Sequence, residues 1–407
     1  MRQPEGFVVP GQEDKVWLLK KSLYGTKQAP RCWNQRINAF MVQRGFYKSH
    51  RDPCLYVKWR GSIPLVVVLY VDDMLVTSPD TCMMKEFKDL LAGEFKMKDL
   101  GEPTLLLGLQ IKRDRARRTL DVTLENYLRE VVDLAGMWSA RPQGNPLPPG
   151  TKLLEDVTGD EAMVVDVTRY RQLLGKLSYA AQKARPDLSV VVGMLAKFQS
   201  KPLVKHWDAL LHAVCYVRDT LSHGLHFDMM HVRDDPSALT LAMYADADYA
   251  NSPDRKAISG SVLQLGGATV SWSSKRQSIT TTSTLEAELV AATRACKEVI
   301  WARGLLCELG LQQHAATPMW EDNQGCIAVC KDASTSILSR HLEVQYFFTR
   351  EKIRTGAVDM RYIPTQEQLA DLLTKPLERV VFRKLRAAVG VVNASSSPSG
   401  SVGSRER

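Results

Sequence analysis

Two adjacent carboxylates stand inside an apolar, β-branched run, "LVVVLYVDDMLVTS" at residues 65–78. Like charges side by side repel each other, and burying either one without a partner is costly. A tight turn that faces solvent would resolve the conflict, and so would a divalent cation. A type I′ hairpin turn prefers Asn-Gly or Asp-Gly, because both of its central residues need a positive φ. Asp72-Asp73 fits that rule poorly, so both interpretations stay open on these residues alone.

A second group of acids lies in the C-terminal part of the chain. Asp246 ends the predicted strand "LTLAMYADAD", and Asp248 points to the same side if the strand continues. A helix is predicted over residues 283–309. Glu288 lies roughly 60° from the centre of its apolar stripe, and Glu286 lies roughly 100° away on the opposite flank. Glu288 is therefore the better candidate to face a sheet and a metal ion.

Two further acids complete this group. Asp322 follows a short strand in "WEDNQG" and can begin the next helix. Asp371, in "EQLADLLTK", lies opposite a stripe of leucines, so helical periodicity alone predicts a solvated acid there. Taken one at a time, each of these four carboxylates is more often an ordinary surface or structural acid than a metal ligand.

The elements that must position these acids follow from composition and periodicity. Residues 1–110 mix helix and strand signals. The stretch "RPQGNPLPPG" at 141–150 carries too many prolines and glycines for a regular element and predicts a linker or an extended strap. Amphipathic helices over 170–220 form a connecting region. From residue 239 the order is β-β-β-α-β-α-α-β-α, a mixed sheet flanked by helices, whose last helix begins at Thr365 with a Thr365/Gln368 capping box.

Overall composition sets the class of protein. The 407 residues are 44% hydrophobic and 24% charged, as in ordinary globular domains, and the net charge of +9 favours an anionic partner such as nucleic acid without proving one. The eight cysteines show no CxxC pair, which indicates reduced thiols. There is no signal-peptide pattern, and the longest apolar run, residues 63–71, is too short to span a bilayer. We therefore expect a soluble intracellular protein with no membrane partner.

Four blocks of the N-terminal part, in order and at matching spacing, resemble the reverse transcriptase of copia-type long-terminal-repeat retrotransposons. They are "SLYGTKQAPRCWNQRINAFM" (22–41), "DPCLYVK" (52–58), "LYVDDMLV" (69–76) and "FKMKDLGEPTLLLGLQI" (95–111). The resemblance implies that Asp72 and Asp73 bind Mg²⁺ at a polymerase centre. It also implies nucleotide or template contacts for Tyr70, Met74, Gly25, Lys27 and Gln28.

The C-terminal part resembles the ribonuclease H of the same elements, in "SGSVLQLGGATVSWSSKRQ", "STLEAELVAAT", "EDNQGCIAV" and "QLADLLTKPL". The resemblance implies that Asp246, Glu288, Asp322 and Asp371 hold Mg²⁺, which Mn²⁺ can replace, and cut the RNA strand of an RNA–DNA hybrid. Lys275 and Arg276 would contact hybrid phosphates, with a solvated basic pair as the alternative. Many ribonucleases H carry a His in the loop before the final Asp. The loop "IPTQEQLAD" has none, and His341 is the only His near it in sequence.

The expected fold class is α+β for a partial reverse-transcriptase palm, a helical connecting region, and an α/β ribonuclease H-like domain with a mixed five-stranded sheet. The expected domains are residues 1–115 (palm), 116–237 (thumb or connection), 238–378 (ribonuclease H-like) and 379–407 (a basic, Ser/Gly-rich disordered tail). Expected partners are an RNA–DNA hybrid, an RNA template with a DNA primer, and other products of the polyprotein. The expected location is the cytoplasm, in a retroelement particle, with the nucleus as the alternative. A catalytically dead relic and a nucleic-acid-binding module are the rival functions.

The first prediction concerns polymerisation. In the family, a third metal-binding carboxylate comes from a strand before the "QPEGF" stretch, which is residues 3–7 here. We therefore expect a 5′-truncated product with part of the palm absent, and purified residues 1–407 should not extend a primer on an RNA template. Primer extension that Asp72→Asn abolishes would contradict this expectation.

Overall fold

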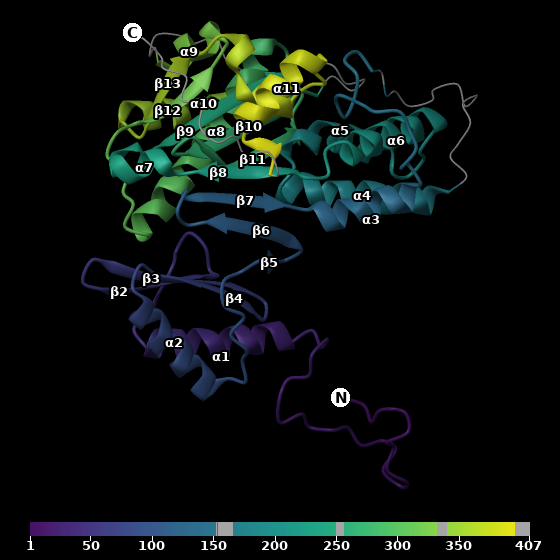
Figure 1. Cartoon of the computed structure of the whole chain (residues 1–407), viewed down its shortest axis with the longest axis vertical. Helices are drawn as coiled ribbons and strands as arrows, with labels where there is room; N and C mark the ends of the chain where they lie inside the picture. The colour runs from purple at the N-terminus through teal and green to yellow at the C-terminus, as the bar shows by residue number, and fades with distance from the viewer. Residues whose placement is uncertain (152, 154–165, 250–255, 332–339, 395–407) are drawn as a thin grey trace. The chain divides into compact units, whose positions relative to one another are not determined.

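The structure is a computed structural model that describes residues 1–151, 153, 166–249, 256–331 and 340–394. These residues form two compact units, one of residues 1–99 with 304–312, and the other of residues 100–303 with those from 313 onward (Figure 1). In the described part of the chain, no helix is long and apolar enough to cross a bilayer.

The first unit packs two helices against a four-stranded antiparallel sheet with the order β1-β2-β3-β4. Alternate residues of β3 face the helices, so Leu65, Val67 and Leu69 are buried while Val68 and Tyr70 are exposed. The elements are α1 (Ala29–Gln43), β1 (Tyr47–Lys48), β2 (Leu55–Arg60), β3 (Ile63–Tyr70), β4 (Asp73–Thr77) and α2 (Thr81–Glu94).

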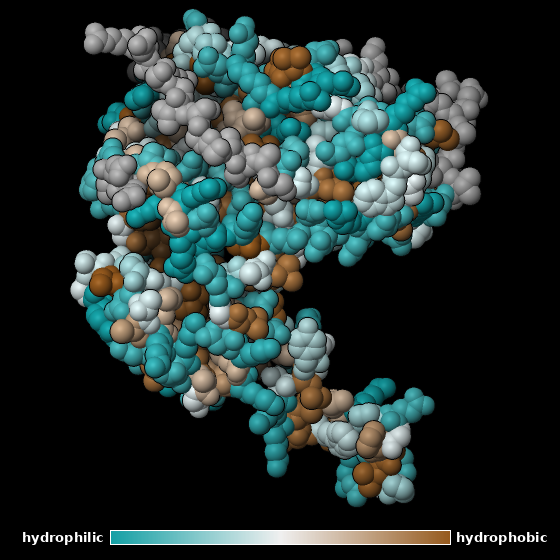
Figure 2. Space-filling view, in the orientation of Figure 1, coloured by the Kyte–Doolittle hydropathy of each residue, from teal (hydrophilic) through white to brown (hydrophobic). Residues whose placement is uncertain are grey.

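The segment before α1 has little regular structure of its own. Residues 1–28 contain one isolated β-bridge, between Arg2 and Val16, and no helix. Several large apolar side chains are exposed on it, and Figure 2 shows brown, hydrophobic atoms among paler ones on the N-terminal segment. They include Phe7, Trp17, Leu18 and Tyr24. Exposed apolar side chains that gather on one segment are typical of a surface that contacts another chain or ligand.

The second unit contains two five-stranded sheets. One is antiparallel, with the order β14-β8-β7-β6-β5, and belongs to the connecting region. Its strands are β5 (Leu105–Leu106), β6 (Leu109–Asp114), β7 (Thr119–Thr123), β8 (His223–Asp228) and β14 (Val391–Asn393). The helices of this region are α3 (Glu125–Ala135), α4 (Val167–Lys183), η1 (Pro186–Leu188), α5 (Ser189–Leu195), η2 (Ala196–Phe198), α6 (Val204–Arg218), α7 (Met230–Asp234) and η3 (Pro236–Ala238).

The other sheet is mixed, with the order β11-β10-β9-β12-β13. Strands β9, β10 and β11 are antiparallel neighbours, whereas β12 runs parallel to both β9 and β13. The elements are β9 (Leu241–Asp248), β10 (Ile258–Leu265), β11 (Ala268–Arg276), α8 (Thr284–Glu308), β12 (Thr317–Glu321), α9 (Gln324–Lys331), α10 (Arg340–Arg354) and β13 (Val358–Tyr362). The mixed five-stranded ribonuclease H-like sheet expected from the sequence is confirmed.

The expectation of a disordered tail from residue 379 is wrong over its first sixteen residues. Arg379–Ala388 forms helix α11, and residues 391–393 pair with β8 as strand β14. Phe382 and Leu385 bury one face of α11 in a core that also contains residues of α3, α4 and α6. This amphipathic helix was not predicted from the sequence, because the basic and Ser-rich composition of residues 379–407 indicates disorder. Residues 395–407 lie outside the described residues.

The expected strap over residues 141–150 contains no helix or strand, and part of it is buried within the second unit. Asn145 and Leu147 are buried. The Asn145 side chain donates a hydrogen bond to the Leu377 carbonyl at 3.1 Å. The backbone carbonyl oxygen of Asn145 lies 3.0 Å from His212 Nε2. The segment therefore ties the connecting region to the residues that follow the ribonuclease H-like sheet.

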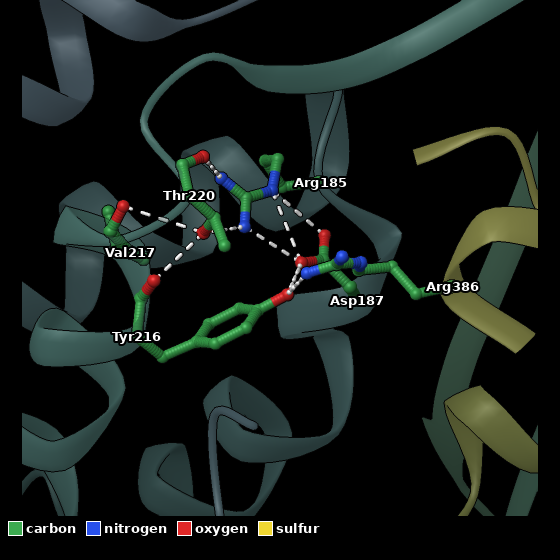
Figure 3. A network of polar contacts seen from close by, with 6 residues as sticks. All are labelled: Arg185, Asp187, Tyr216, Val217, Thr220 and Arg386. Atoms are coloured by element: carbon green, nitrogen blue, oxygen red, sulfur yellow. Dashed lines mark hydrogen bonds and ion pairs between the residues drawn. The ribbon is translucent and has the colours of Figure 1, made fainter. Parts of the chain in front are cut away.

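A buried ion pair joins the same two parts (Figure 3). Arg185 and Asp187 are almost completely buried and meet at 2.8 Å, and Arg185 also donates to the carbonyl and the hydroxyl of Thr220. Tyr216 donates to Asp187 at 2.7 Å, and Arg386 of α11 donates to the Tyr216 hydroxyl at 3.1 Å. The Arg185 guanidinium opposes the cost of burial and holds the pKa of Asp187 below its ordinary value.

The second prediction tests this network. Asp187→Asn leaves the Arg185 charge buried without compensation, which costs about 3–5 kcal/mol. Glu130→Gln breaks the exposed pair between Glu130 and Lys176 of the same region and should cost at most about 1 kcal/mol. Chemical unfolding followed by circular dichroism measures both. Equal losses for the two variants would contradict the role of the network.

Candidate functional site

Three of the four acids predicted in the C-terminal part come together in space. One carboxylate oxygen each from Asp246, Glu288 and Asp322 lies within 4.8 Å of the others. Asp246 is near the end of β9, Glu288 is in the second turn of α8, and Asp322 directly follows β12. Because β9 and β12 are parallel neighbours, their carboxyl ends meet at one edge of the sheet, where α8 adds its side chain.

The start of α8 explains why Glu288 rather than Glu286 joins this group. The Ser283 hydroxyl accepts the backbone N–H of Glu286, and the Glu286 carboxylate accepts the N–H and the hydroxyl of Thr282 at 2.6 and 2.8 Å. Glu286 is thus a reciprocal helix-capping residue. Buried Gln277 donates to the Ala287 carbonyl at 2.9 Å and fixes the first turn of α8 against β11.

Asp371 lies beside the group on another element. It is buried in η5 (Leu369–Leu373), a 3₁₀ segment that packs on β9 and β10. The sequence predicted an α-helix from Thr365, and that prediction is wrong, because η4 (Thr365–Glu367) and η5 replace it. With about three residues per turn, the tighter coil buries Asp371 together with its neighbouring leucines. Helical periodicity had placed it in solvent.

Side chains of the η4–η5 segment hold two of the carboxylates. Thr365 donates to Asp322 at 2.7 Å, and Thr374 donates to Asp246 at 2.6 Å. Lys375 forms an ion pair with Asp371 at 2.9 Å. These partners were not predicted from the sequence, because their spacing has no periodic signal and only the three-dimensional packing brings them to the acids.

Gln368 connects three of the four acid-bearing elements, β9, β12 and η5. Its side chain is fully buried and donates to the carbonyls of Ala245 on β9 and Trp320 on β12, at 2.9 and 3.3 Å. It also accepts the N–H of Ala370 at 3.2 Å, one residue before Asp371. The sequence predicted only a capping role for Gln368. The structure shows that its amide fixes the segment that carries Asp371 relative to both strands.

The close packing of η5 depends on Gly260 of β10, which lies opposite Asp246 in the register. A Cβ at Gly260 would approach the Ala370 carbonyl oxygen to 2.7 Å and Thr374 Cγ2 to 2.6 Å. Because one of these atoms belongs to the backbone, the segment itself would have to move. Gly260 therefore permits the contact between Thr374 and Asp246.

The electrostatics of the site reflect crowded, buried acids. Burial, reinforced by Glu321, Asp246 and Asp322, raises the pKa of Glu288 to about 11. Burial and the adjacent Asp246 raise the pKa of Asp371 to about 7, against the opposing effect of the Lys375 ammonium. Without a cation, several of these groups hold a proton at neutral pH.

Glu321 is a fifth acid at this site that the sequence analysis missed. It ends β12 and is fully buried, and its Oε1 accepts the Asn323 N–H at 3.1 Å. Its Oε2, like Glu288 Oε2, is buried with no hydrogen-bond partner among the described residues. Burial raises the pKa of Glu321 well above its ordinary value. Its position next to Asp322 was the available signal.

The second pair of acids lies on a hairpin of the first unit. Tyr70 pairs with Asp73, so Val71 and Asp72 form the two-residue turn, and both aspartates are exposed. Val71 has a φ of 56°, an unusual conformation for a β-branched residue. Trp33 of α1 donates to the Val71 carbonyl at 2.6 Å and helps to hold that conformation. Neighbouring Tyr70 is exposed, and Met74 is half-buried.

The remaining predicted contact residues lie at the surface. Gly25, Lys27 and Gln28 are exposed directly before α1, and Gln28 is the residue that precedes its first turn. Lys275 and Arg276 are exposed at the end of β11. His341 lies in α10, and its side chain lies outside the described residues. The roles proposed for all of these residues stay predictions.

Comparison with known proteins gives the family. A model of the reverse transcriptase (RNA-dependent DNA polymerase) family matches residues 1–149. The Retrovirus-related Pol polyprotein from transposon TNT 1-94 of Nicotiana tabacum is 36% identical over 96% of this chain, which spans 29% of that polyprotein. The polyprotein from transposon RE2 of Arabidopsis thaliana is 33% identical over 98% of this chain and 27% of its own length.

A shorter relative is matched almost completely. The putative transposon Ty5-1 protein of Saccharomyces cerevisiae is 30% identical over 74% of this chain and 94% of its own length. Among solved structures, a ribonuclease H crystallised with an RNA/DNA hybrid has 17% identity and a TM-score of 0.27, covering 33% of this chain and 94% of that one.

Residues 1–149, which include most of the first unit and the start of the second, match the reverse transcriptase family. The chain belongs to the retrovirus-related Pol polyproteins of copia-type transposons, as the sequence predicted. It spans between a quarter and a third of the length of the two plant polyproteins described above.

The third prediction tests the packing of η5. Gly260→Ala should force this segment away from β10 and destabilise the domain by about 1–3 kcal/mol, the usual cost of overpacking. Gly175→Ala is the matched control, since a Cβ there meets nothing within 4 Å and helix α4 should gain up to about 1 kcal/mol. Thermal melting measures both. Gly260→Ala as stable as wild type would contradict the close contact.

Proposed function

We propose that the C-terminal domain hydrolyses the RNA strand of RNA–DNA hybrids in a Mg²⁺-dependent reaction, and that Mn²⁺ can replace Mg²⁺. The observation that carries the proposal is the convergence of Asp246, Glu288 and Asp322 at one edge of the sheet, with Asp371 beside Asp246. A solved relative in fold has been crystallised with an RNA/DNA hybrid, and hybrid is the substrate that we propose here.

The donor set fits a hard divalent cation. All of the converging groups are carboxylates, and Mg²⁺ and Mn²⁺ prefer oxygen ligands. Glu288 Oε2 is buried without a hydrogen-bond partner among the described residues, which is expensive unless a proton or a cation compensates it. Asp246, Glu288, Asp322 and Asp371 would therefore hold the metal.

The chain's own residues would orient the reacting groups. Thr374 donates to one oxygen of Asp246, and Thr365 donates to one oxygen of Asp322. These hydrogen bonds fix the direction of the remaining lone pairs of each carboxylate. Bound divalent ions would activate a water molecule to attack the phosphodiester and would stabilise the leaving oxygen. Lys275 and Arg276 offer exposed cations for phosphates of the hybrid.

For the first unit we propose the metal-binding hairpin of a reverse transcriptase, with Asp72 and Asp73 as its carboxylates and an RNA template with a DNA primer as its partner. The support is the match of residues 1–149 to the reverse transcriptase family and the exposed position of both aspartates at the β3–β4 turn. We also propose, from the same family resemblance, that other products of the polyprotein are partners and that the protein is located in a cytoplasmic particle.

The fourth prediction tests the ribonuclease. Mg²⁺ should raise the melting temperature in proportion to ln(1 + [Mg²⁺]/Kd), because it relieves repulsion between the acids. Asp246→Asn and Asp322→Asn should each abolish hybrid cleavage. They should leave the metal-free protein at least as stable as wild type, since each removes one repelling charge. Melting curves with and without Mg²⁺, beside cleavage of a labelled hybrid, measure these effects.

Glu286→Gln is the matched control, because it preserves the capping contacts of α8 and lies outside the cluster. It should cleave like wild type. Normal cleavage by Asp246→Asn would show that the site is wrong. Salt-sensitive binding of hybrid without cleavage by wild type would favour the nucleic-acid-binding module, and neither binding nor cleavage would favour the relic.

A further inference from the structure

One cation of the chain itself lies among the carboxylates of this site. Lys375 Nζ is 2.9 Å from Asp371 Oδ1, four residues before it in sequence. Burial lowers the pKa of Lys375, but the carboxylates of Asp246, Asp371 and Asp248 outweigh that effect, so the pKa is raised. The ammonium is held in direct contact with Asp371, one of the acids that would bind metal.

The position of Lys375 allows its charged end to move. Its side chain is 35% exposed, whereas Asp371 is almost completely buried, so the ammonium lies at the solvent side of the acid. The backbone is held by its neighbours: the Thr374 hydroxyl binds Asp246, and the side chains of Leu373 and Leu377 are buried in the core. A flexible stem of four carbons lies between that fixed backbone and the ammonium.

A metal ion and this ammonium would compete. Both are attracted by the negative charge of Asp371 and of Asp246 beside it, and two positive charges a few ångströms apart repel each other. The same carboxylates therefore cannot interact fully with the metal ion and with the Lys375 ammonium at the same time. Binding of a divalent ion would therefore weaken the ion pair and release the ammonium toward solvent, the side from which a phosphodiester backbone must approach the acids.

We propose that Lys375 is an exchangeable cation of the ribonuclease centre. Without metal its ammonium compensates Asp371 and Asp246, and with metal bound it turns to a phosphate of the nucleic-acid substrate. The inference rests on the proposed function, because it takes the four carboxylates as the metal ligands. It predicts that one substitution strengthens metal binding and weakens substrate binding, a combination that a purely structural role of Lys375 would not produce.

The fifth prediction is tested on the full chain with three variants. Lys375→Met removes the charge and keeps a stem of similar length, and Lys375→Arg keeps the charge. Lys331→Met is the matched control, because it removes one exposed positive charge from the same domain, at the end of α9. Metal affinity is read from the melting temperature during titration with Ca²⁺, Mg²⁺ or Mn²⁺ alone, without substrate. The KM for a labelled RNA–DNA hybrid is measured separately at saturating Mg²⁺.

Lys375→Met should bind metal about tenfold more tightly, within the usual range of coupling between two binding events. It should melt at a lower temperature without metal and raise the KM for hybrid severalfold. Lys375→Arg should stay near wild type in both measurements, and Lys331→Met should change neither. Unchanged or weaker metal binding by Lys375→Met, or an equal effect of Lys331→Met, would overturn the assignment. If wild type responds to no metal, the proposed metal centre fails, and the assignment of Lys375 fails with it.

Discussion

Repulsion between buried carboxylates is the constraint on which the second unit is built. Asp246, Glu288, Asp371 and Glu321 are buried beside half-buried Asp322, and this burial and crowding raise the pKa of Glu288, Asp371 and Glu321. Such a group is unfavourable unless protons, hydrogen bonds or cations compensate it. The two threonine hydroxyls and the Lys375 ammonium compensate part of the charge from within the chain. A divalent ion would do so more completely, since it can bind several of the acids at once.

The packing around the acids keeps them together against that repulsion. Gln368 joins β9, β12 and the η5 segment through three hydrogen bonds, and Gly260 lets η5 lie directly on β10. Outside the sheet, the core of the connecting region continues into α11 and β14, and the buried pair of Arg185 and Asp187 lies at that junction. The connecting region and the ribonuclease H-like sheet therefore support each other, and the end of η5 is anchored by Leu377 and Phe382 in the shared core.

The sequence predicted the mixed sheet and the candidate acids because those signals are local. Alternation along β9 and the apolar stripe of α8 need only neighbouring residues. What it missed depends on contacts between distant segments. Asp371 was placed in solvent because a 3.6-residue period was assumed where a 3₁₀ coil forms. Helix α11 was assigned to the tail because Arg379–Ala388 is rich in basic residues, and only burial of Phe382 and Leu385 against the connecting region shows its apolar face. Glu321 was not predicted, because the neighbouring Asp322 already supplied the acid expected after the strand in "WEDNQG".

The two acidic sites differ in how the repulsion between their carboxylates is reduced. Asp72 and Asp73 lie exposed at a hairpin turn, where water screens their repulsion and the strain falls instead on the backbone of Val71. The acids of the second site are buried, apart from half-buried Asp322, so their repulsion is screened much less and needs protons or cations. A buried group of this kind binds metal more selectively by geometry, because the lone pairs are fixed before the ion arrives. An exposed pair depends more on its ligands to complete the site. The metal site proposed for the hairpin would therefore depend on nucleotide and template far more than the site proposed for the second unit would depend on hybrid.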